Sequence, residues 1–317
     1  MDWTIVYSAV GVCAALLAGY LIRRNLKKPP AQRQPSTSPL KSLEPDEKAA
    51  LFALFEPTAM PFIRLTPALK PTGVFDCKVG GTPYLPPLFD YPHNTSPGSN
   101  GGPLRLLVQL NFGQLPHLPG YPQNGILQVY IADDSNDDLY GLDRQHPTAQ
   151  AAWRVVYHKD IVDDERRLQP APPLDDAKEA YFPLNGEFGL EAQLAEQALS
   201  RTDYRWNAFF EQTVAPSPLY QSLQVKYSEL ELEIALAELT VPLDLKVGGY
   251  PQFTQADPRD GSGLEAYSQL LVQLDSWEAD NGMGILFGDY GVANWFIKPS
   301  ALAARDFSDI LYNWDCY

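Results

Sequence analysis

The residues best suited to chemistry lie in one acidic cluster, within the segment DDSNDDLYGLD. Carboxylates offer the hard oxygen atoms that Ca²⁺ and Mg²⁺ prefer, and the candidate metal ligands are Asp133, Asp134, Asp137 and Asp138. The spacing does not fit an EF-hand, because counting from Asp134 the sixth residue is Leu139 instead of Gly and the twelfth is Gln145 instead of Glu. A solvated acidic turn is therefore the favoured interpretation. No cofactor is predicted, and a divalent cation is the alternative.

Other catalytic motifs are missing from the chain. The glycines of GILFGDYGVANWFI (284–297) do not follow the dinucleotide-binding spacing, and another strand-like run follows them where a helix is required. We interpret this segment as a hairpin with Asp289 at its turn. The sequence has no G-x-S-x-G motif, no Walker loop and no His-Glu-x-x-His motif. These absences leave the question of enzymatic activity open and favour a protein that is not an enzyme.

Several aromatic and polar residues near predicted loops suit a recognition surface as well as a core. The candidate binding residues are Tyr84, Tyr91, Asn111, Tyr140, Asp289 and Tyr290.

One phrase occurs twice in the chain, as KVGGTPYLP from Lys78 and as KVGGYPQFT from Lys246. Each copy is followed by the strand-like run LLVQL, at 106–110 and 270–274, and then by Asn-Gly and an Ile-Leu run. Asn-Gly is a strong hairpin signal, since both residues tolerate positive φ. The order predicts a duplicated β-rich unit, with repeat one at about 74–160 and repeat two at about 241–317.

The segment between the copies, about 174–240, is rich in Ala, Leu, Glu and Gln at helical spacing. It includes GLEAQLAEQALSRTDYRWNAFFEQ, which we expect to be helical. The predicted fold class is α+β, with duplicated, mainly antiparallel β-rich halves and inserted helices.

The amino-terminal segment predicts a membrane anchor. Residues 3–22 carry no charge, and a run of this length is long enough for a transmembrane helix. The basic residues Arg23, Arg24, Lys27 and Lys28 follow at once. Because basic residues that flank a transmembrane helix stay on the cytoplasmic side, we expect a single-pass protein with its amino terminus outside and its main domain in the cytoplasm. Residues 1–28 form the anchor with its basic flank, residues 29–45 a Pro/Ser-rich tether, and residues 46–317 the α+β domain.

The charge of the chain excludes nucleic acid as a partner. Lys and Arg number 24 and Asp and Glu 39, which gives −15. Residues 1–33 hold five of the basic residues and one acid, so residues 34–317 carry 19 minus 38, or −19. A body this acidic repels phosphate backbones and favours a basic protein partner.

The segments VGGTPYLP, LLVQLNF, GILQVYIADDSNDDLYG and GDYGVANWFIKPSALAARDFSDILYNWDCY occur in an order that resembles the bacterial YwqG-like family, a domain of unknown function. The resemblance covers roughly residues 60–317. It implies an α+β fold with a duplication and brings no activity or cofactor. Some members lie in toxin-immunity neighbourhoods, which implies a partner-binding role.

Together these observations predict a binding protein, attached to the bacterial inner membrane, that recognises a protein partner with its cytoplasmic domain. Two alternatives stay open. One is a divalent-metal-dependent enzyme that uses the acidic cluster, joined by Asp289. The other is a small-molecule binder that uses the cleft between the two repeats.

Overall fold

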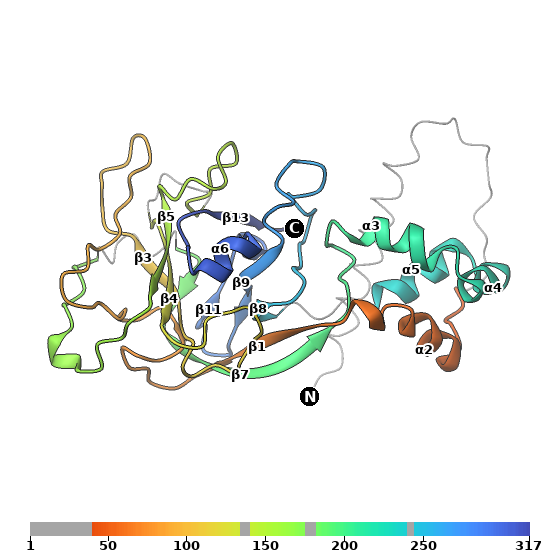
Figure 1. The fold of residues 1–317 in the computed structure, drawn as a ribbon, viewed down its shortest axis with the longest axis horizontal. Helices are drawn as coiled ribbons and strands as arrows, with labels where there is room; N and C mark the ends of the chain where they lie inside the picture. Colours follow the sequence, from red (N-terminus) through yellow and green to blue (C-terminus); the bar gives the residue numbers. More distant parts are fainter. Residues whose placement is uncertain (1–39, 134–139, 175–181, 240–243) are drawn as a thin grey trace. The chain divides into compact units, whose positions relative to one another are not determined.

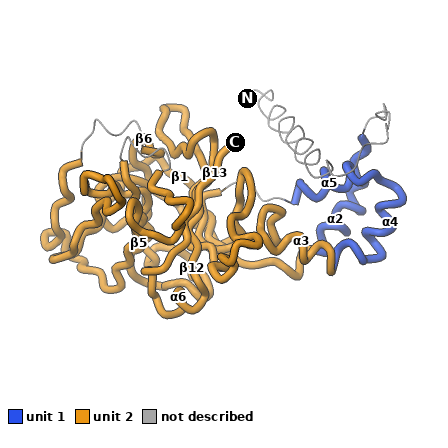
Figure 2. Tube along the Cα trace, turned by 90° about the horizontal axis from the view of Figure 1, so that it is seen from above, with its two compact units in different colours: residues 1–54, 213–239 blue, residues 55–212, 240–317 orange. Residues whose placement is uncertain are grey.

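The computed structural model describes residues 40–133, 140–174, 182–239 and 244–317 (Figure 1). The chain divides into two compact units (Figure 2). The described residues within 1–54 and 213–239 form the first, here called the helical unit, and those within 55–212 and 240–317 form the second, the β unit.

The helical unit contains three nine-residue helices in its described part, α2 (Pro45–Ala53), α4 (Pro218–Lys226) and α5 (Glu229–Ala237). Polar residues mark two of the starts, because Ser217 caps α4 and Ser228 forms a capping box with Glu231 at α5. The Lys226 Nζ atom lies 2.5 Å from Glu47 Oε1, which joins α4 to α2.

The β unit is built on a ten-stranded sheet in which every pair of strands is antiparallel. Its strands are β1 (Met60–Ala68), β2 (Lys78–Val79), β3 (Arg105–Asn111), β4 (Ile126–Ile131), β5 (Trp153–His158), β7 (Phe188–Gln197), β8 (Leu245–Gly248), β9 (Gln269–Asp275), β12 (Val292–Ile297) and β13 (Ile310–Asp315). A smaller sheet contains β10 (Trp277–Glu278), β11 (Gly284–Ile285) and β6 (Leu184–Asn185). Short helices α3 (Trp206–Phe209) and α6 (Pro299–Ala304) and the π-helix η4 (Phe210–Val214) complete the described helices of four or more residues.

The strand order of the large sheet reads alike from both edges. It runs β13-β12-β9-β8-β1 from one edge and β5-β4-β3-β2-β7 from the other. The strands β2, β3, β4 and β5 therefore correspond to β8, β9, β12 and β13, around a pseudo-two-fold axis between β1 and β7.

The leading strand of each copy is exchanged. The strand β1 precedes copy one in the chain but pairs with β8 of copy two, whereas β7 precedes copy two but pairs with β2 of copy one. Between them β1 and β7 form a ladder of nine residue pairs, from Met60↔Gln197 to Ala68↔Gly189. The two copies are therefore interlocked within one sheet.

Both faces of the central strands are covered. All seven residues of β3 and all six of β12 are buried, so the polar residues of these strands are buried with the apolar ones. The sheet also curls until its edge strands meet, since the rings of Trp153 on β5 and Tyr312 on β13 lie 5.3 Å apart. The result is a barrel-like sheet that is nearly closed.

The third match of the sequence repeat is not a structural match. Asn124-Gly125 precedes β4 of the large sheet, but Asn281-Gly282 lies in the turn between β10 and β11 of the small sheet. The strand that pairs with β9 as β4 pairs with β3 is β12, which begins at Val292.

The predicted α+β class is wrong, because the fold is mainly antiparallel β-sheet with few helices. The main error lies in the segment 174–240, where GLEAQLAEQ forms the strand β7 between β1 and β2. Ala, Leu, Glu and Gln favour helices, but this segment gains ladder hydrogen bonds on both sides and buries Phe188, Gly189 and Leu190. Tertiary pairing overrides the intrinsic preference.

The predicted membrane helix, residues 3–22, lies outside the described residues. Among those that are described, no helix is long and apolar enough to cross a bilayer. The nine residues of α2, α4 or α5 span about 14 Å at about 1.5 Å per residue, against about 30 Å of hydrocarbon. The transmembrane part of the fold class, the membrane partner, the single-pass topology and the inner-membrane location find no support in the structure. This finding corrects those predictions.

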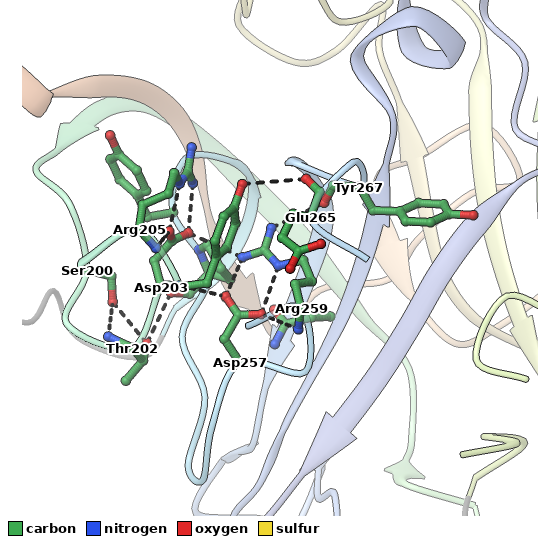
Figure 3. A network of polar contacts seen from close by, with 12 residues as sticks. Ser200, Thr202, Asp203, Arg205, Asp257, Arg259, Glu265 and Tyr267 are labelled. Carbon is green, nitrogen blue, oxygen red and sulfur yellow. Dashed lines mark hydrogen bonds and ion pairs between the residues drawn. The ribbon is translucent and has the colours of Figure 1, made fainter. Parts of the chain in front are cut away.

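A buried charge network ties the segment after β7 to the loop between β8 and β9 (Figure 3). The Arg259 side chain is fully buried, and its Nη2 atom donates to Asp257 Oδ2 at 2.6 Å and to Asp203 Oδ2 at 3.2 Å. The backbone N–H of Tyr204 donates to Asp257 as well. One guanidinium therefore satisfies two buried carboxylates from separate segments.

The local Asp-x-Arg arrangement of this network also occurs on the surface. In three places, the arginine backbone N–H and Nε donate to one oxygen of the aspartate two residues earlier, and Nη2 donates to the other. The three pairs are Asp164–Arg166, Asp203–Arg205 and Asp257–Arg259. The Arg166 side chain is 89% exposed, which makes it a matched control for Arg259.

We predict that Arg259→Met lowers the free energy of unfolding by roughly 3–5 kcal/mol, because it leaves Asp257 buried without its cation and Asp203 with Arg205 alone. Arg166→Met breaks the same local contacts in water and should change the free energy little. Urea unfolding of both variants measures the difference. Equal effects would show that burial of the network is not what stabilises these loops.

Candidate functional site

Two lysines occupy matching buried positions in the two copies. Lys78 on β2 and Lys246 on β8 are almost completely buried. The Nζ atom of Lys78 donates to the carbonyl of Thr82, and that of Lys246 donates at 2.6 Å to the carbonyl of Tyr250, the equivalent residue. Lys246 also donates to Gln197 Oε1 at 3.2 Å. Each ammonium group thus holds the Gly-Gly turn that follows its strand, which explains why the sequence repeats this phrase.

A glutamine lies opposite each lysine, Gln109 on β3 and Gln273 on β9. Its Oε1 atom accepts a backbone N–H from beyond the Gly-Gly turn, and its Nε2 atom donates to a carbonyl just before the lysine strand. The partners are Tyr84 N and Asp76 O for Gln109, and Gln252 N and Asp244 O for Gln273. The lysine and the glutamine of each copy, here called its polar array, therefore satisfy equivalent backbone groups in the two copies.

A neutral side chain of copy one corresponds to a carboxyl group of copy two where Asn111 corresponds to Asp275. Asn111 Nδ2 donates to the Phe75 carbonyl at 2.8 Å. Burial raises the pKa of Asp275 to about 7, and the nearby charge of Asp244 adds to this shift. Burial also lowers the pKa of Lys246 to about 7. These groups hold strands in register inside the protein, and neither lysine lines the pocket described next.

A pocket of about 490 Å³ lies on the small sheet of the β unit. Residues of copy one, of β6 and of copy two all line it, so it lies between the two repeats. Four of its lining residues are aromatic: Tyr140, Phe182, Trp277 and Tyr290. Such a volume and such an aromatic lining are typical of sites for small ligands or for single side chains.

The strands of the small sheet build the pocket. Ile285 of β11 pairs with Trp277 of β10 on one side and with Leu184 of β6 on the other. The backbones approach closely at Gly284, where a Cβ atom would lie 2.2 Å from the Trp277 carbonyl oxygen. Trp277 itself packs against Phe188 of β7, with ring centroids 5.0 Å apart, and this contact joins the pocket to the large sheet.

Two pocket tyrosines have a strained backbone. Tyr140 has φ 48° and Tyr290 has φ 50°, in the left-handed region that bulky residues rarely adopt. Tyr140 is held firmly, because its hydroxyl accepts from the Gly288 N–H at 3.3 Å and its ring packs against Trp314. Strained residues of this kind cluster at ligand sites, where surrounding contacts maintain them.

The structure brings together two of the six predicted binding residues, Tyr140 and Tyr290. Asp289 is exposed next to Tyr290. The remaining three are structural: Tyr84 and Asn111 are buried in the copy-one array, and the Tyr91 hydroxyl donates to the Leu104 carbonyl at 2.9 Å.

The predicted metal ligands receive no support. Asp133 is buried and forms an ion pair with Arg105, with Oδ2 3.0 Å from Nε. Asp134, Asp137 and Asp138 lie outside the described residues. In the part of the chain that the structure describes, no group of three or more His, Cys, Asp or Glu side chains could hold a metal ion.

Sequence reasoning missed Phe182, Trp277 and Glu278 as lining residues of this pocket. The sequence of the segment Trp277–Tyr290 does indicate a surface site. This segment combines aromatic, acidic and glycine residues, and it lies between the buried strands β9 and β12. Phe182 carries none, because only the pairing of β6 with β11 brings its segment to the pocket.

The family model of a domain of unknown function, DUF1963, matches residues 77–316. The match includes both copies of the polar array and every residue that lines the pocket. No curated protein matches the chain.

We predict that Asp275→Asn raises stability at alkaline pH. The folded pKa of Asp275, about 7, exceeds its ordinary value of 3.8, so its favourable contribution is complete below pH 3.8 and is lost as the pH rises through 7. The variant should match the natural protein near pH 4 and exceed it by up to about 4 kcal/mol near pH 8, because the shift from 3.8 to about 7 corresponds to about 1.4 kcal/mol per pKa unit.

Urea unfolding at several pH values measures this difference. The reciprocal variant, Asn111→Asp, is the control, and its stability should fall as the pH rises above about 4, since an ionised carboxylate cannot donate to the Phe75 carbonyl. A difference for Asp275→Asn that does not change with pH would contradict the assignment.

Proposed function

The chain belongs to the DUF1963 family, and we propose that it is a non-enzymatic binding protein. In this proposal, the aromatic pocket between its repeats holds a projecting group of a protein partner. The observation that carries the proposal is the pocket itself, with about 490 Å³ of space and four aromatic residues around it. Aromatic residues dominate binding energy at interfaces because they bury a large area at a small cost in conformational entropy.

Exposed apolar side chains at the pocket support this function. Leu286 is 48% exposed and Tyr290 is 54% exposed, and both line the pocket. Large apolar side chains that share a concave site mark a binding surface more strongly than single ones scattered over a protein.

Rigidity of the site also supports a binding role. The Tyr140 ring packs edge-on against Phe287, with centroids 5.5 Å apart, and its carbonyl accepts a hydrogen bond from the Tyr312 hydroxyl at 3.1 Å. A side chain held in one place before a partner arrives loses little entropy on binding.

We further propose that, within its family, the chain is YwqG-like. The support is the order of the segments VGGTPYLP, LLVQLNF and GILQVYI along the chain. The toxin-immunity neighbourhoods implied by this resemblance suit a protein that binds another protein.

Selection of peptides from a displayed random library against the full chain tests the proposal. We expect enriched peptides whose affinity falls by about tenfold or more when Tyr290→Ser or Trp277→Leu removes an aromatic wall. Tyr290 is exposed, so Tyr290→Ser should fold normally, and calorimetric titration with the selected peptides gives the affinities.

The matched control is Leu88→Ser, since Leu88 is 98% exposed but does not line the pocket. This variant should bind the selected peptides as the natural chain does. If no peptide is enriched, or if the enriched peptides bind the pocket variants with unchanged affinity, the proposed function is wrong.

A further inference from the structure

The charged residue that lines the pocket in the described part of the chain is acidic, and so are the charged residues of the segment that carries it. The segment from Trp277 to Tyr290 contains three acids, Glu278, Asp280 and Asp289, and no Lys or Arg. All three acids are exposed, and Glu278 lines the pocket directly. Among the residues that the structure describes, none of those that line the pocket is basic. The pocket therefore presents a negative rim to whatever enters.

One cation close to the aromatic lining is already neutralised. The Arg105 guanidinium lies 5.7 Å from the centroid of the Phe182 ring, but it is buried and paired with Asp133. It does not line the pocket, so it does not offset the charge of Glu278 there.

The aromatic residues add a second attraction for positive charge. The faces of Trp, Tyr and Phe rings carry negative electrostatic potential, and several of them around one cavity favour an organic cation. Glu278 lies on β10 directly after Trp277, and its strand partner Gly284 also lines the pocket. A carboxylate and four aromatic residues thus surround the same space.

We infer that the group bound in this pocket is an organic cation, either a Lys or Arg side chain of the partner or a free ammonium compound. This inference rests on the proposed function and names the chemistry of its ligand. The ring faces stabilise the apolar shell of such a cation, and Glu278 neutralises its charge. An anion meets repulsion at the rim, and a neutral ligand of the same shape gains only the apolar contacts.

Titration of the full chain with choline and with its neutral carbon analogue, 3,3-dimethylbutan-1-ol, tests the inference. Saturation-transfer NMR detects weak binding of either compound, and N-acetylarginine amide tests the side-chain source in the same way. We expect the cations to bind about tenfold tighter than the neutral analogue, and Glu278→Gln to weaken the cations alone, by threefold or more. Glu165→Gln, an exposed acid that does not line the pocket, is the control.

The outcomes separate the two proposals. Equal affinity for choline and its neutral analogue, or cation binding that Glu278→Gln leaves unchanged, overturns the cation inference while the pocket stays a binding site. Binding of the arginine amide without choline assigns the cation to a partner side chain. Binding of choline without the arginine amide assigns it to a free compound, which keeps the cation inference and overturns the proposed protein partner. If no cation binds but the selected peptides still depend on Tyr290, the cation inference alone is wrong. If neither the probes nor the peptides depend on the pocket, the proposed function is wrong as well.

Discussion

The pairing of β1 with β7 is the interaction on which the rest of the β unit depends. Each of these strands leads one copy in the chain and pairs with the second strand of the other copy. Neither copy can therefore complete its half of the sheet alone, because its innermost neighbour comes from the other half. A duplication joined in this way behaves as one cooperative sheet, and the space between its halves is part of the fold.

Inside this sheet, buried lysines and glutamines satisfy backbone groups at the matching turns of the two copies. Each Gly-Gly turn leaves backbone groups that cannot join a ladder, and buried backbone groups without partners are costly. Lys78 and Gln109 satisfy them in copy one, and Lys246 and Gln273 do so in copy two. Burial lowers the pKa of Lys246, but the buried lysines and glutamines have a structural role. The pocket is therefore the candidate site.

The pocket lies where the two copies stop matching. After β3, copy one continues to β4 of the large sheet, whereas copy two inserts β10 and β11 between β9 and β12. The strand β11 pairs with both β10 and β6, and β10 carries Trp277 and Glu278 of the pocket. The duplicated strands support the pocket, and the inserted strands β10 and β11, which have no counterpart in copy one, contribute to its lining.

The sequence by itself determined the repeated turns, the buried LLVQL strands and two pocket residues, Tyr140 and Tyr290, because these follow from local patterns of glycine, alternating polarity and aromatic residues near loops. It could not determine that GLEAQLAEQ is a strand, since only pairing with β1 and β2 outweighs its helical preference. The exchange of leading strands and the meeting of Phe182 with Trp277 were likewise decided by tertiary structure. Contacts between segments far apart in the chain leave no periodic signal in either segment, so they emerge only when the sheet is assembled.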